Sequence, residues 1–191
     1  MASTDIYRVP SSASNRKTFT FSAWVKRSGL ADAGIFTAGA DSDVEGYFSI
    51  YFSGNAIRVR TYESSAKDVV TSAVYRDVSA WYHLVVQIDT TQSTDTNRVK
   101  IYINGQEQTK ASASYMSQDY QTSVNNTTTQ SVGRTRNSAG GSDNRFDGYM
   151  SHVAFVDGSV VAPTVFGSTD STSGIWKFKA PSGVTWGTNG F

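Results

Sequence analysis

The feature that most constrains the fold is the alternation of apolar and polar residues in the stretch WYHLVVQIDTTQSTDTNRVKIYINGQ. In residues 82–88 and again in residues 99–103, every second side chain is large and apolar. A period of two places these side chains on one face of an extended chain, which is typical of a strand with one buried face. Asn104 and Gly105 then supply two residues that tolerate a positive φ, as a tight type I′ turn requires. The stretch therefore predicts two strands followed by a hairpin turn.

The same alternation recurs along the chain and predicts the fold class. It indicates further strands at residues 18–25, 48–52, 57–61 and 149–156. No segment has the periodicity of a long helix, and Pro163 marks the one place where a short helical turn could begin. Many short strands separated by turn residues are typical of an all-β, antiparallel two-sheet jelly-roll sandwich.

The chain is predicted to have one domain with a short segment at each end. Its 191 residues suffice for a single β-sandwich with a well-buried core. Residues 1–17 are rich in Ser and Ala and are expected to form an N-terminal arm. The sandwich is expected over residues 18–167, and residues 168–191 form an aromatic and Gly-rich C-terminal tail or an extra strand.

Composition argues against several classes of function. The chain has 17 Lys and Arg against 16 Asp and Glu, a net charge of +1, so no basic excess favours nucleic-acid binding. No apolar run approaches the roughly 20 residues that cross a bilayer, which argues against membrane insertion. The chain has no cysteine, so neither a disulfide framework nor a thiolate site is available.

The order of the predicted strands resembles a known family. The segments FTFSAWVKR, GYFSIYF, IRVRTY, WYHLVVQID, RVKIYINGQ, SVGRT and FDGYMSHVAFVDG follow one another as in laminin-G-like, concanavalin A-like domains. The resemblance covers residues 18–167 and implies the concanavalin A-like jelly roll. The later segment FGSTDSTSGIWKFKAPSGVTWGTNGF resembles one that follows such domains in tailed-phage structural proteins. This second resemblance implies a virion protein, used for capsid or tail decoration, made in the host cytoplasm and released by lysis.

The enzyme hypothesis fails on the distribution of carboxylates. Retaining glycosidases need two carboxyl groups about 5–5.5 Å apart. The glutamates Glu45, Glu63 and Glu107 are isolated from one another, and no predicted strand has acidic residues at positions i, i+2 and i+4. His83 and His152 lie in predicted strands without a nucleophile motif, so both are interpreted as structural. The chain is therefore predicted to have no catalytic residues.

The resemblance also implies a metal, since laminin-G-like domains often hold Ca²⁺ at the rim of the sandwich. The loop AGADSDVEG brings Asp41, Asp43 and Glu45 together, and Asp89 ends a predicted strand. Carboxylate oxygens are suitable ligands for Ca²⁺. These four residues are the predicted Ca²⁺ ligands, and the alternative is that they are solvated loop carboxylates.

A sugar site would combine aromatic faces with hydrogen-bonding groups. Tyr51, Arg58, Arg60 and Tyr62 are the predicted carbohydrate-binding residues, and host-surface glycans are the corresponding partners. Exposed aromatic residues lining one groove would favour a lectin, whereas a large apolar patch would favour assembly. The alternative function is accordingly a free lectin-like module or a degenerate glycosidase-fold protein.

The C-terminal tail carries the prediction of assembly. Trp176, Phe178, Trp186 and Phe191 lie in a Gly-rich stretch with too little neighbouring sequence to bury all of them. Leaving large aromatic side chains in water forgoes roughly 1.5–3 kcal/mol each. They are therefore predicted to contact other virion proteins or further copies of the chain in a homo-oligomer. The alternative is that the tail folds back across the sandwich as an extra edge strand.

Overall fold

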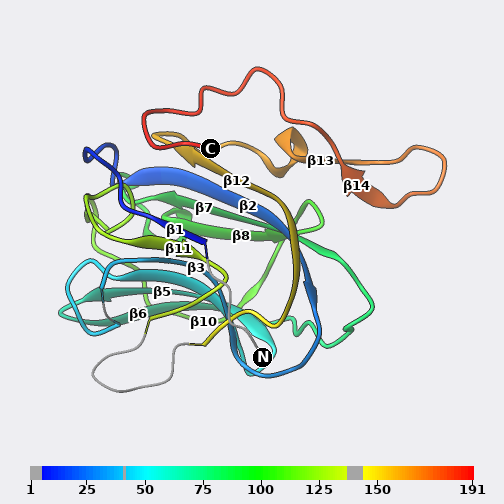
Figure 1. The fold of residues 1–191 in the computed structure, drawn as a ribbon, viewed down its shortest axis with the longest axis horizontal. Coiled ribbons are helices and arrows are strands. Elements are labelled where there is room, and N and C mark those ends of the chain that lie inside the picture. The colour runs from blue at the N-terminus through cyan, green and yellow to red at the C-terminus, as the bar shows by residue number, and fades with distance from the viewer. Residues whose placement is uncertain (1–5, 41, 137–143) are drawn as a thin grey trace.

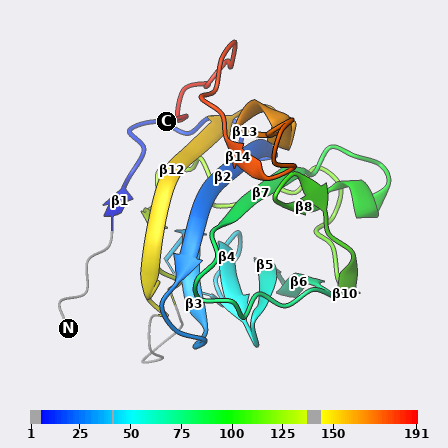
Figure 2. The ribbon, with the colours of Figure 1, turned by 90° about the vertical axis from the view of Figure 1, so that its right-hand side faces the viewer.

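The computed structural model describes residues 6–40, 42–136 and 144–191 and shows two large antiparallel sheets packed face to face (Figures 1 and 2). The all-β jelly-roll class predicted from the sequence is confirmed. Two short 3-10 helices are present in this part of the chain, η1 (Asp95–Asn97) and η2 (Pro163–Val165), and the second begins at the predicted Pro163. None of the described helices is long and apolar enough to cross a membrane.

The larger sheet has seven strands in the order β1-β11-β3-β4-β5-β6-β10. All neighbouring pairs in it are antiparallel. The strands are β1 (Ile6–Arg8), β3 (Ala33–Ala38), β4 (Phe48–Ser53), β5 (Ala56–Glu63), β6 (Ser65–Thr71), β10 (Lys110–Ala113) and β11 (Gln130–Val132).

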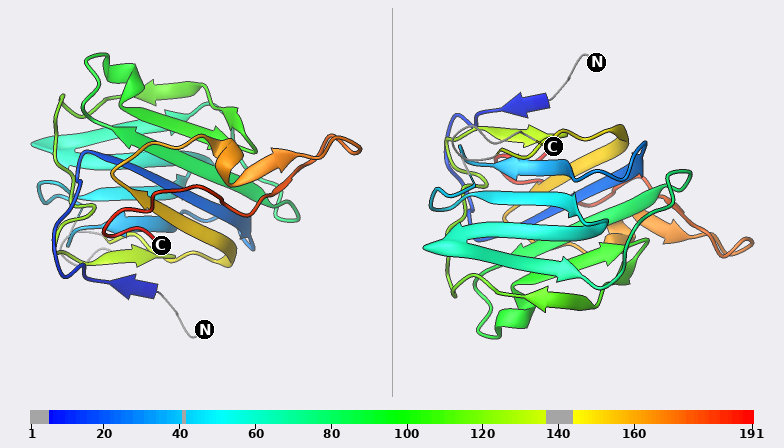
Figure 3. Two further views of the ribbon diagram at one scale, coloured as in Figure 1. Left: turned by 90° about the horizontal axis from the view of Figure 1, so that it is seen from above. Right: turned by 90° about the horizontal axis from the view of Figure 1, so that it is seen from below.

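The smaller sheet has five strands in the order β12-β2-β7-β8-β9, and a separate hairpin, β13-β14, lies over its outer face (Figure 3). The strands of the sheet are β2 (Thr18–Arg27), β7 (Tyr82–Asp89), β8 (Val99–Ile103), β9 (Gln106–Glu107) and β12 (Gly148–Asp157). The hairpin consists of β13 (Gly167–Thr169) and β14 (Trp176–Phe178).

The alternating side chains identified in the sequence form the core between the two sheets. Phe19 and Phe21 of β2 are fully buried, and their rings contact Phe48 and Phe36 of the opposite sheet with centroids 5.2 and 5.0 Å apart. Phe155 of β12 completes the aromatic cluster. Each aromatic pair stabilises the fold by roughly 0.5–1.5 kcal/mol beyond the contribution of the apolar area that it buries. The cluster therefore helps to hold the two sheets in one relative position.

The predicted Asn-Gly hairpin joins β8 to β9. Asn104 and Gly105 have φ values of 49° and 80°, as a type I′ turn requires. The Asn104 side chain also accepts a hydrogen bond from the backbone N–H of His83 at 2.9 Å. The turn therefore also fixes the start of β7, which carries His83.

Several strands lacked a sequence pattern and were not predicted. β3 reads AGIFTA and is buried along its whole length, and a register shift between Gly34 and Phe36 interrupts its alternation. Residues 111–129 are mostly polar and show no alternation, yet they contribute part of β10 and bury Met116 and Val124. A strand made of small residues shows little contrast between its two faces, and a bulge shifts the alternation by one residue. Such strands are therefore not detected by a search for a period of two.

The described part of the N-terminal segment is docked on its own sandwich. β1 pairs with β11, and the hydroxyl of Ser14 donates to the buried carboxylate of Asp157 at 2.6 Å. The same carboxylate accepts from the Asn125 amide at 2.7 Å and from the backbone N–H of Asn189 at 2.9 Å. One carboxylate thus ties the N-terminal segment, the 120s loop and the C-terminal segment to β12.

The C-terminal tail folds back over the outer face of the five-stranded sheet (Figures 1 and 3). Trp186 is half-buried and packs against a second apolar cluster that contains Val85, Val156 and Phe166. Its carbonyl accepts a hydrogen bond from the N–H of Asp157. This arrangement corresponds to the alternative in which the tail covers the sandwich, and it places Trp176 and Phe178 on the outer face of the sheet.

Candidate functional site: an aromatic groove and a polar hollow

An open groove with a volume of about 350 Å³ runs along the outer face of the five-stranded sheet, beside the C-terminal hairpin. We call it the aromatic groove, since aromatic rings make up most of its walls. Trp81 and Phe178 are each 41% exposed, so part of each side chain is accessible to a ligand. The groove is lined by Trp24, Trp81, Ser151, His152, Trp176, Lys177 and Phe178.

Two glycines allow Trp176 to lie flat against the sheet. A Cβ atom at Gly105 would stand 2.6 Å from the indole ring, and one at Gly167 would stand 2.5 Å from it. Both distances are shorter than any normal carbon contact, so a larger residue at either position would displace the ring. The Asn104-Gly105 turn, predicted from the sequence as a hairpin turn, therefore also provides the surface on which a groove residue packs.

A hydrogen bond from Trp176 to His83 fixes the indole in this position. The indole Nε1–H donates to His83 Nδ1 at 2.9 Å, and the two ring planes are only 18° apart. Trp24 stacks on the same imidazole, with ring centroids 5.0 Å apart and planes inclined by 15°. Two of the three tryptophans that line the groove, Trp24 and Trp176, are therefore positioned by one buried histidine.

The protonation state of His83 follows from its partners. An indole N–H can only donate, so Nδ1 must accept, and Nε2 carries the proton of the neutral ring. Nε2 lies 2.9 Å from the hydroxyl of Ser22, which accepts that proton's hydrogen bond. Burial of the side chain lowers the pKa of His83 from 6.5 to about 4. Complete burial and two hydrogen bonds give His83 the structural role that the sequence predicted.

His152 differs from the expectation that it would be packed within a strand. It lies in a bulge of β12 between Ser151 and Ala154, has a φ of 49° and is exposed. Its ring stacks on Phe178, with centroids 3.6 Å apart. A positive φ is uncommon for a residue other than glycine. Here the bulge turns the imidazole outward, so that it lines the groove beside the hairpin.

A second hollow, of about 180 Å³, lies on the outer face of the seven-stranded sheet and is mainly polar. We call it the polar hollow. The residues that line it are Asp32, Ser42, Tyr47, Ser49, Tyr51, Ser53, Arg60, Thr135, Arg136 and Asn144. Residues 137–143, which connect two of these, lie outside the described residues.

The structure brings three of the predicted carbohydrate-binding residues together at the polar hollow. Tyr51 and Arg60 line it, and Arg58 lies beside Tyr51, with its guanidinium 3.5 Å from the phenol oxygen. Tyr62 is on β5 but does not line the hollow. Arg60 makes two hydrogen bonds of 2.8 Å to Asp68, which raise the pKa of the guanidinium. Burial raises the pKa of the Tyr51 phenol.

Of the predicted Ca²⁺ ligands, Asp41 lies outside the described residues. Asp43 is exposed, and Glu45 accepts hydrogen bonds from the Ser64 N–H at 2.9 Å and the Tyr120 hydroxyl at 2.6 Å. These bonds lower the pKa of Glu45. Within the described ranges, no three Asp, Glu, His or Cys side chains are grouped as a metal site. Calcium at this loop therefore stays a prediction.

Asp89, the fourth predicted ligand, stabilises the end of its own strand. Its carboxylate accepts from the Thr91 hydroxyl at 2.5 Å, the Thr91 N–H at 3.1 Å and the Gln92 amide at 2.6 Å. Asx-type turns of this kind are a common way to end a strand. The carboxylate therefore has a structural function in the turn after β7.

Among the described residues, no pair of carboxylates lines either hollow. The described lining of the aromatic groove has no acidic residue, and that of the polar hollow has Asp32 alone. Asp32 accepts a hydrogen bond from the Gly54 N–H at 2.9 Å. Glycoside hydrolysis by two carboxyl groups therefore has no support from the residues that line either site.

The four residues predicted for assembly have different surroundings. Trp176 and Trp186 are half-buried against their own sandwich, contrary to the expectation that the tail could not cover them locally. Phe178 and Phe191 are 41% and 43% exposed. Phe178 lines the aromatic groove, whereas Phe191 lies at the side of the sandwich next to β1.

The fold is that of a lectin-like β-sandwich. The chain belongs to the concanavalin A-like lectin/glucanases superfamily, because the model of that family matches residues 2–166. This membership confirms the laminin-G-like resemblance over most of the chain. No curated protein sequence matches the chain.

Solved structures with the same fold come from several organisms. A heptameric SAP-like pentraxin from Limulus polyphemus is similar with a TM-score of 0.63 and 14% identity, over 96% of this chain and 82% of the pentraxin. The CBM40 of a Ruminococcus gnavus sialidase, bound to α2,3-sialyllactose, has a TM-score of 0.55 and 12% identity, over 85% and 96% of the two chains.

A third similar structure is domain 4 of AbnA, a GH43 extracellular arabinanase of Geobacillus stearothermophilus, in complex with arabinotriose. It has a TM-score of 0.58 and 19% identity, and the match covers 79% of this chain. The match spans only 65% of the arabinanase-domain chain. At these sequence identities the similarity shows a shared fold only. It says nothing about which residues of this chain bind a ligand in either hollow.

Proposed function

We propose that this chain is a non-enzymatic glycan-binding module that holds a sugar in the aromatic groove. The observation that carries the proposal is the gathering of Trp24, Trp81, Trp176 and Phe178 around one open groove. Exposed aromatics in a single groove are the feature expected of a lectin rather than of an assembly surface. Ser151 and Lys177 add hydrogen-bonding groups to the lining.

The physical basis is the complementarity between a pyranose ring and an indole. One face of a sugar ring presents C–H groups, which pack on an aromatic ring, while the hydroxyl groups at its edge bind polar side chains or water. Trp176 and Trp24 are held in place before binding by His83. A wall that is already ordered loses little conformational entropy on binding, so the arrangement suits a small, flexible ligand.

Two of the similar structures support the choice of ligand class, since they were solved with arabinotriose and with sialyllactose. The absence of paired carboxylates in the described lining supports binding without cleavage. The polar hollow is the second candidate for the sugar site. Its hydroxyl and guanidinium groups favour it, but Tyr51 is only 8% exposed and offers little ring surface for stacking.

A glycan array followed by calorimetry tests the proposal. The intact chain is expected to bind at least one oligosaccharide on an array that includes arabino-oligosaccharides and sialyllactose. Trp81→Ala is expected to weaken that binding by about tenfold or more, since it removes an accessible stacking face. Tyr149→Ala is the matched control: Tyr149 is 63% exposed on the same sheet but does not line the groove.

The outcomes separate the groove from the polar hollow. Binding that is lost in Arg60→Gln but kept in Trp81→Ala would place the sugar at the polar hollow instead. Absence of binding to every glycan at millimolar concentration would reject a glycan-binding function. Release of reducing ends from a bound oligosaccharide during overnight incubation would reject the non-enzymatic part of the proposal.

We further propose that the module is a component of a phage virion, in the capsid or the tail. This proposal rests on the resemblance of residues 166–191 to a segment of tailed-phage structural proteins. In that setting the groove would contact host-surface glycans, and the chain would contact other virion proteins. Peptides of the chain are expected in the mass spectra of purified particles at a stoichiometry of many copies. Their absence from particles, with the chain present in the lysate, would contradict the proposal.

A further inference from the structure

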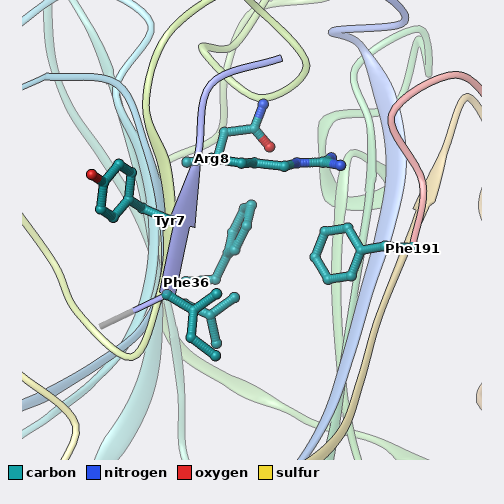
Figure 4. A pocket seen from close by; sticks show the side chains of 7 residues that line it. Tyr7, Arg8, Phe36 and Phe191 are labelled. Carbon is teal, nitrogen blue, oxygen red and sulfur yellow. The ribbon is translucent and has the colours of Figure 1, made fainter. Parts of the chain in front are cut away.

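A third hollow, of about 240 Å³, opens at the side of the sandwich between β1 and the C-terminal residue (Figure 4). We call it the edge cleft, and its lining consists of Ile6, Tyr7, Arg8, Phe36, Gln130, Val132 and Phe191. Figure 4 shows Arg8 and Phe191 extending into the cleft from opposite sides, with Phe36 nearer β1 and Tyr7 on the opposite side of that strand. The Arg8 guanidinium lies 4.8 Å from the centre of the Phe191 ring. The cleft lies apart from the aromatic groove, with which it shares no residue.

The edge cleft is the end of the core, where one sheet extends beyond the other. In the register of the seven-stranded sheet, Ile6 pairs with Val132, and Val132 pairs with the buried Phe36. These three residues therefore share the inward face of the sheet. Ile6 is nevertheless 72% exposed, because the five-stranded sheet ends at β12 and does not reach across from β1. Among the described residues nothing covers this inward-facing isoleucine, which indicates room for a further layer.

Gln130 marks the cleft as a site for a polar group as well. This residue is 3% exposed and lines the cleft, and neither atom of its side-chain amide has a hydrogen-bond partner among the described residues. A buried amide without partners costs roughly 1–3 kcal/mol for each lost bond, so such groups are rare without a function. The side-chain amide has an acceptor oxygen and an NH₂ group with two donors. It can therefore bind both the N–H and the C=O of a peptide group.

Phe191 shows how a strand can lie in this place. It exchanges two backbone hydrogen bonds with Phe155, of 2.7 and 2.9 Å, as an antiparallel pair does. Its ring points inward and stacks on Phe155, with centroids 5.8 Å apart. Among the described residues, the backbone bonds on the outer edge of β12 are this pair and the bond of Asp157 with Trp186. The edge beside residues 149–153 is thus open to further pairing.

We propose that the edge cleft receives an extended strand of a partner protein, apolar at alternate residues, which pairs with β12 in line with Phe191. Its inward side chains fill the space between Phe191 and Ile6, and its backbone bonds the edge of β12. A peptide group of the strand faces the amide of Gln130. The strand becomes a sixth strand of the smaller sheet and covers the part of the larger sheet that β12 leaves open.

A strand explains the lining better than the other occupants do. A small apolar molecule would fill the cleft but would leave the edge of β12 unpaired. A second copy of the chain has little to donate, since the segments with alternating apolar residues, such as residues 82–88 and 99–103, are already inside its sheets. The strand therefore comes from another protein.

Fluorescence polarisation with a synthetic peptide tests the proposal. The probe is a fluorescein-labelled ten-residue peptide of alternating valine and threonine, and two controls have the same composition. One control has alternate backbone amides N-methylated, and the other has its valines clustered. The first peptide is expected to bind the full chain, and both controls are expected to bind about tenfold more weakly or not at all.

Two variants of β1 locate the peptide. Ile6→Lys is expected to weaken binding by about tenfold or more, since it places a charge on the inward face of the cleft. Tyr7→Lys is the matched control, because Tyr7 is 66% exposed on the other face of the same strand, and its affinity is expected to change less than about twofold. Gln130→Leu is expected to weaken binding by several-fold without lowering the temperature of unfolding, as removal of an unpaired buried amide is not destabilising.

Each other outcome overturns the proposal. No binding of the alternating peptide at millimolar concentration would exclude strand addition. Equal binding of the N-methylated peptide would show that the edge of β12 is not used, and equal effects of Ile6→Lys and Tyr7→Lys would place the peptide elsewhere. Self-association of the chain in light scattering, abolished by Ile6→Lys alone, would identify a second copy as the occupant.

Discussion

Replacement of Arg27 by alanine is expected to lower the free energy of unfolding by about 3–4 kcal/mol. Arg27 ends β2, is 1% exposed, and donates to the carbonyls of Tyr75 at 2.8 Å and Ala31 at 3.0 Å. A third bond, of 3.0 Å, reaches the side-chain oxygen of Asn55. The guanidinium also lies 4.3 Å from the centre of the Phe52 ring, a cation–π contact. Alanine would leave these acceptors unpaired and a cavity beside Phe52.

Urea unfolding measured by fluorescence checks this expectation. Lys26→Ala is the matched control, since Lys26 is the preceding residue of β2 and is only half-buried, and its effect is expected to stay within about 0.5 kcal/mol. Arg27→Lys is expected to recover only part of the lost stability. The ammonium group of lysine lacks the planar fork of N–H donors with which the guanidinium reaches its three acceptors. If Arg27→Ala were as stable as the control, the network would contribute nothing to the fold.

The position of Arg27 also shows the limits of a period-two pattern. Residues 18–25 were predicted to form a strand, and the structure extends it to Arg27. A charged residue after an alternating run reads as the start of a loop, because a lone arginine is seldom fully buried. Its burial depends on carbonyls contributed by residues 31 and 75, and no local signal indicates that these turns meet the end of the strand.

The strands that were predicted share a property that the others lack. Residues 82–88 and 99–103 alternate large apolar side chains with polar ones, and the predicted Asn-Gly turn closes the pairing of β8 with β9. β3 and β10 consist mainly of small residues and contain or adjoin register shifts. Their strand conformation is imposed by neighbouring strands, and tertiary context of that kind leaves little trace in the local sequence.

The aromatic groove could be foreseen only in part. Its tryptophans are visible in the sequence, but Trp24, Trp81 and Trp176 are spread over most of the chain, and which of them are exposed is decided by packing. The same applies to the tail, where Trp176 finds its partner in His83, 93 positions away. The sequence showed that the tail's aromatic residues need cover. The flat seat that Gly105 and Gly167 offer to an indole was detectable only in the structure.

Acidification is expected to destabilise the protein by about 3 kcal/mol through His83 alone. Burial lowers the pKa of this residue from 6.5 to about 4 in the folded chain, so the unfolded chain binds a proton at a higher pH than the folded chain does. The contribution of a neutral His83 is therefore complete above pH 6.5. It falls progressively as the pH is lowered toward 4, where the folded state also takes up the proton.

Besides burial, the hydrogen bond of the ring with Trp176 opposes protonation of His83. Nδ1 already accepts the Trp176 indole N–H, so a second proton would set two donors against each other. Protonation can be accommodated only if Trp176 moves away, which would open one wall of the aromatic groove to water. Loss of stability and loss of the groove's shape are thus expected over the same range of pH.

Urea unfolding at pH 7 and pH 4 of the natural chain and of His83→Gln measures the effect. Glutamine keeps an acceptor and a donor but has no proton to gain, so its pH dependence reports all other titrating groups, including the carboxylates. The natural chain is expected to lose about 3 kcal/mol more than the variant between the two pH values. Trp176→Phe removes the indole donor and should raise the pKa of His83 toward its usual value. The loss of stability between pH 7 and pH 4 is then expected to be smaller than in the natural chain. Parallel pH dependences in the natural chain and His83→Gln would show that the imidazole is already solvated in the folded state, and that the Trp176 wall is not held by it.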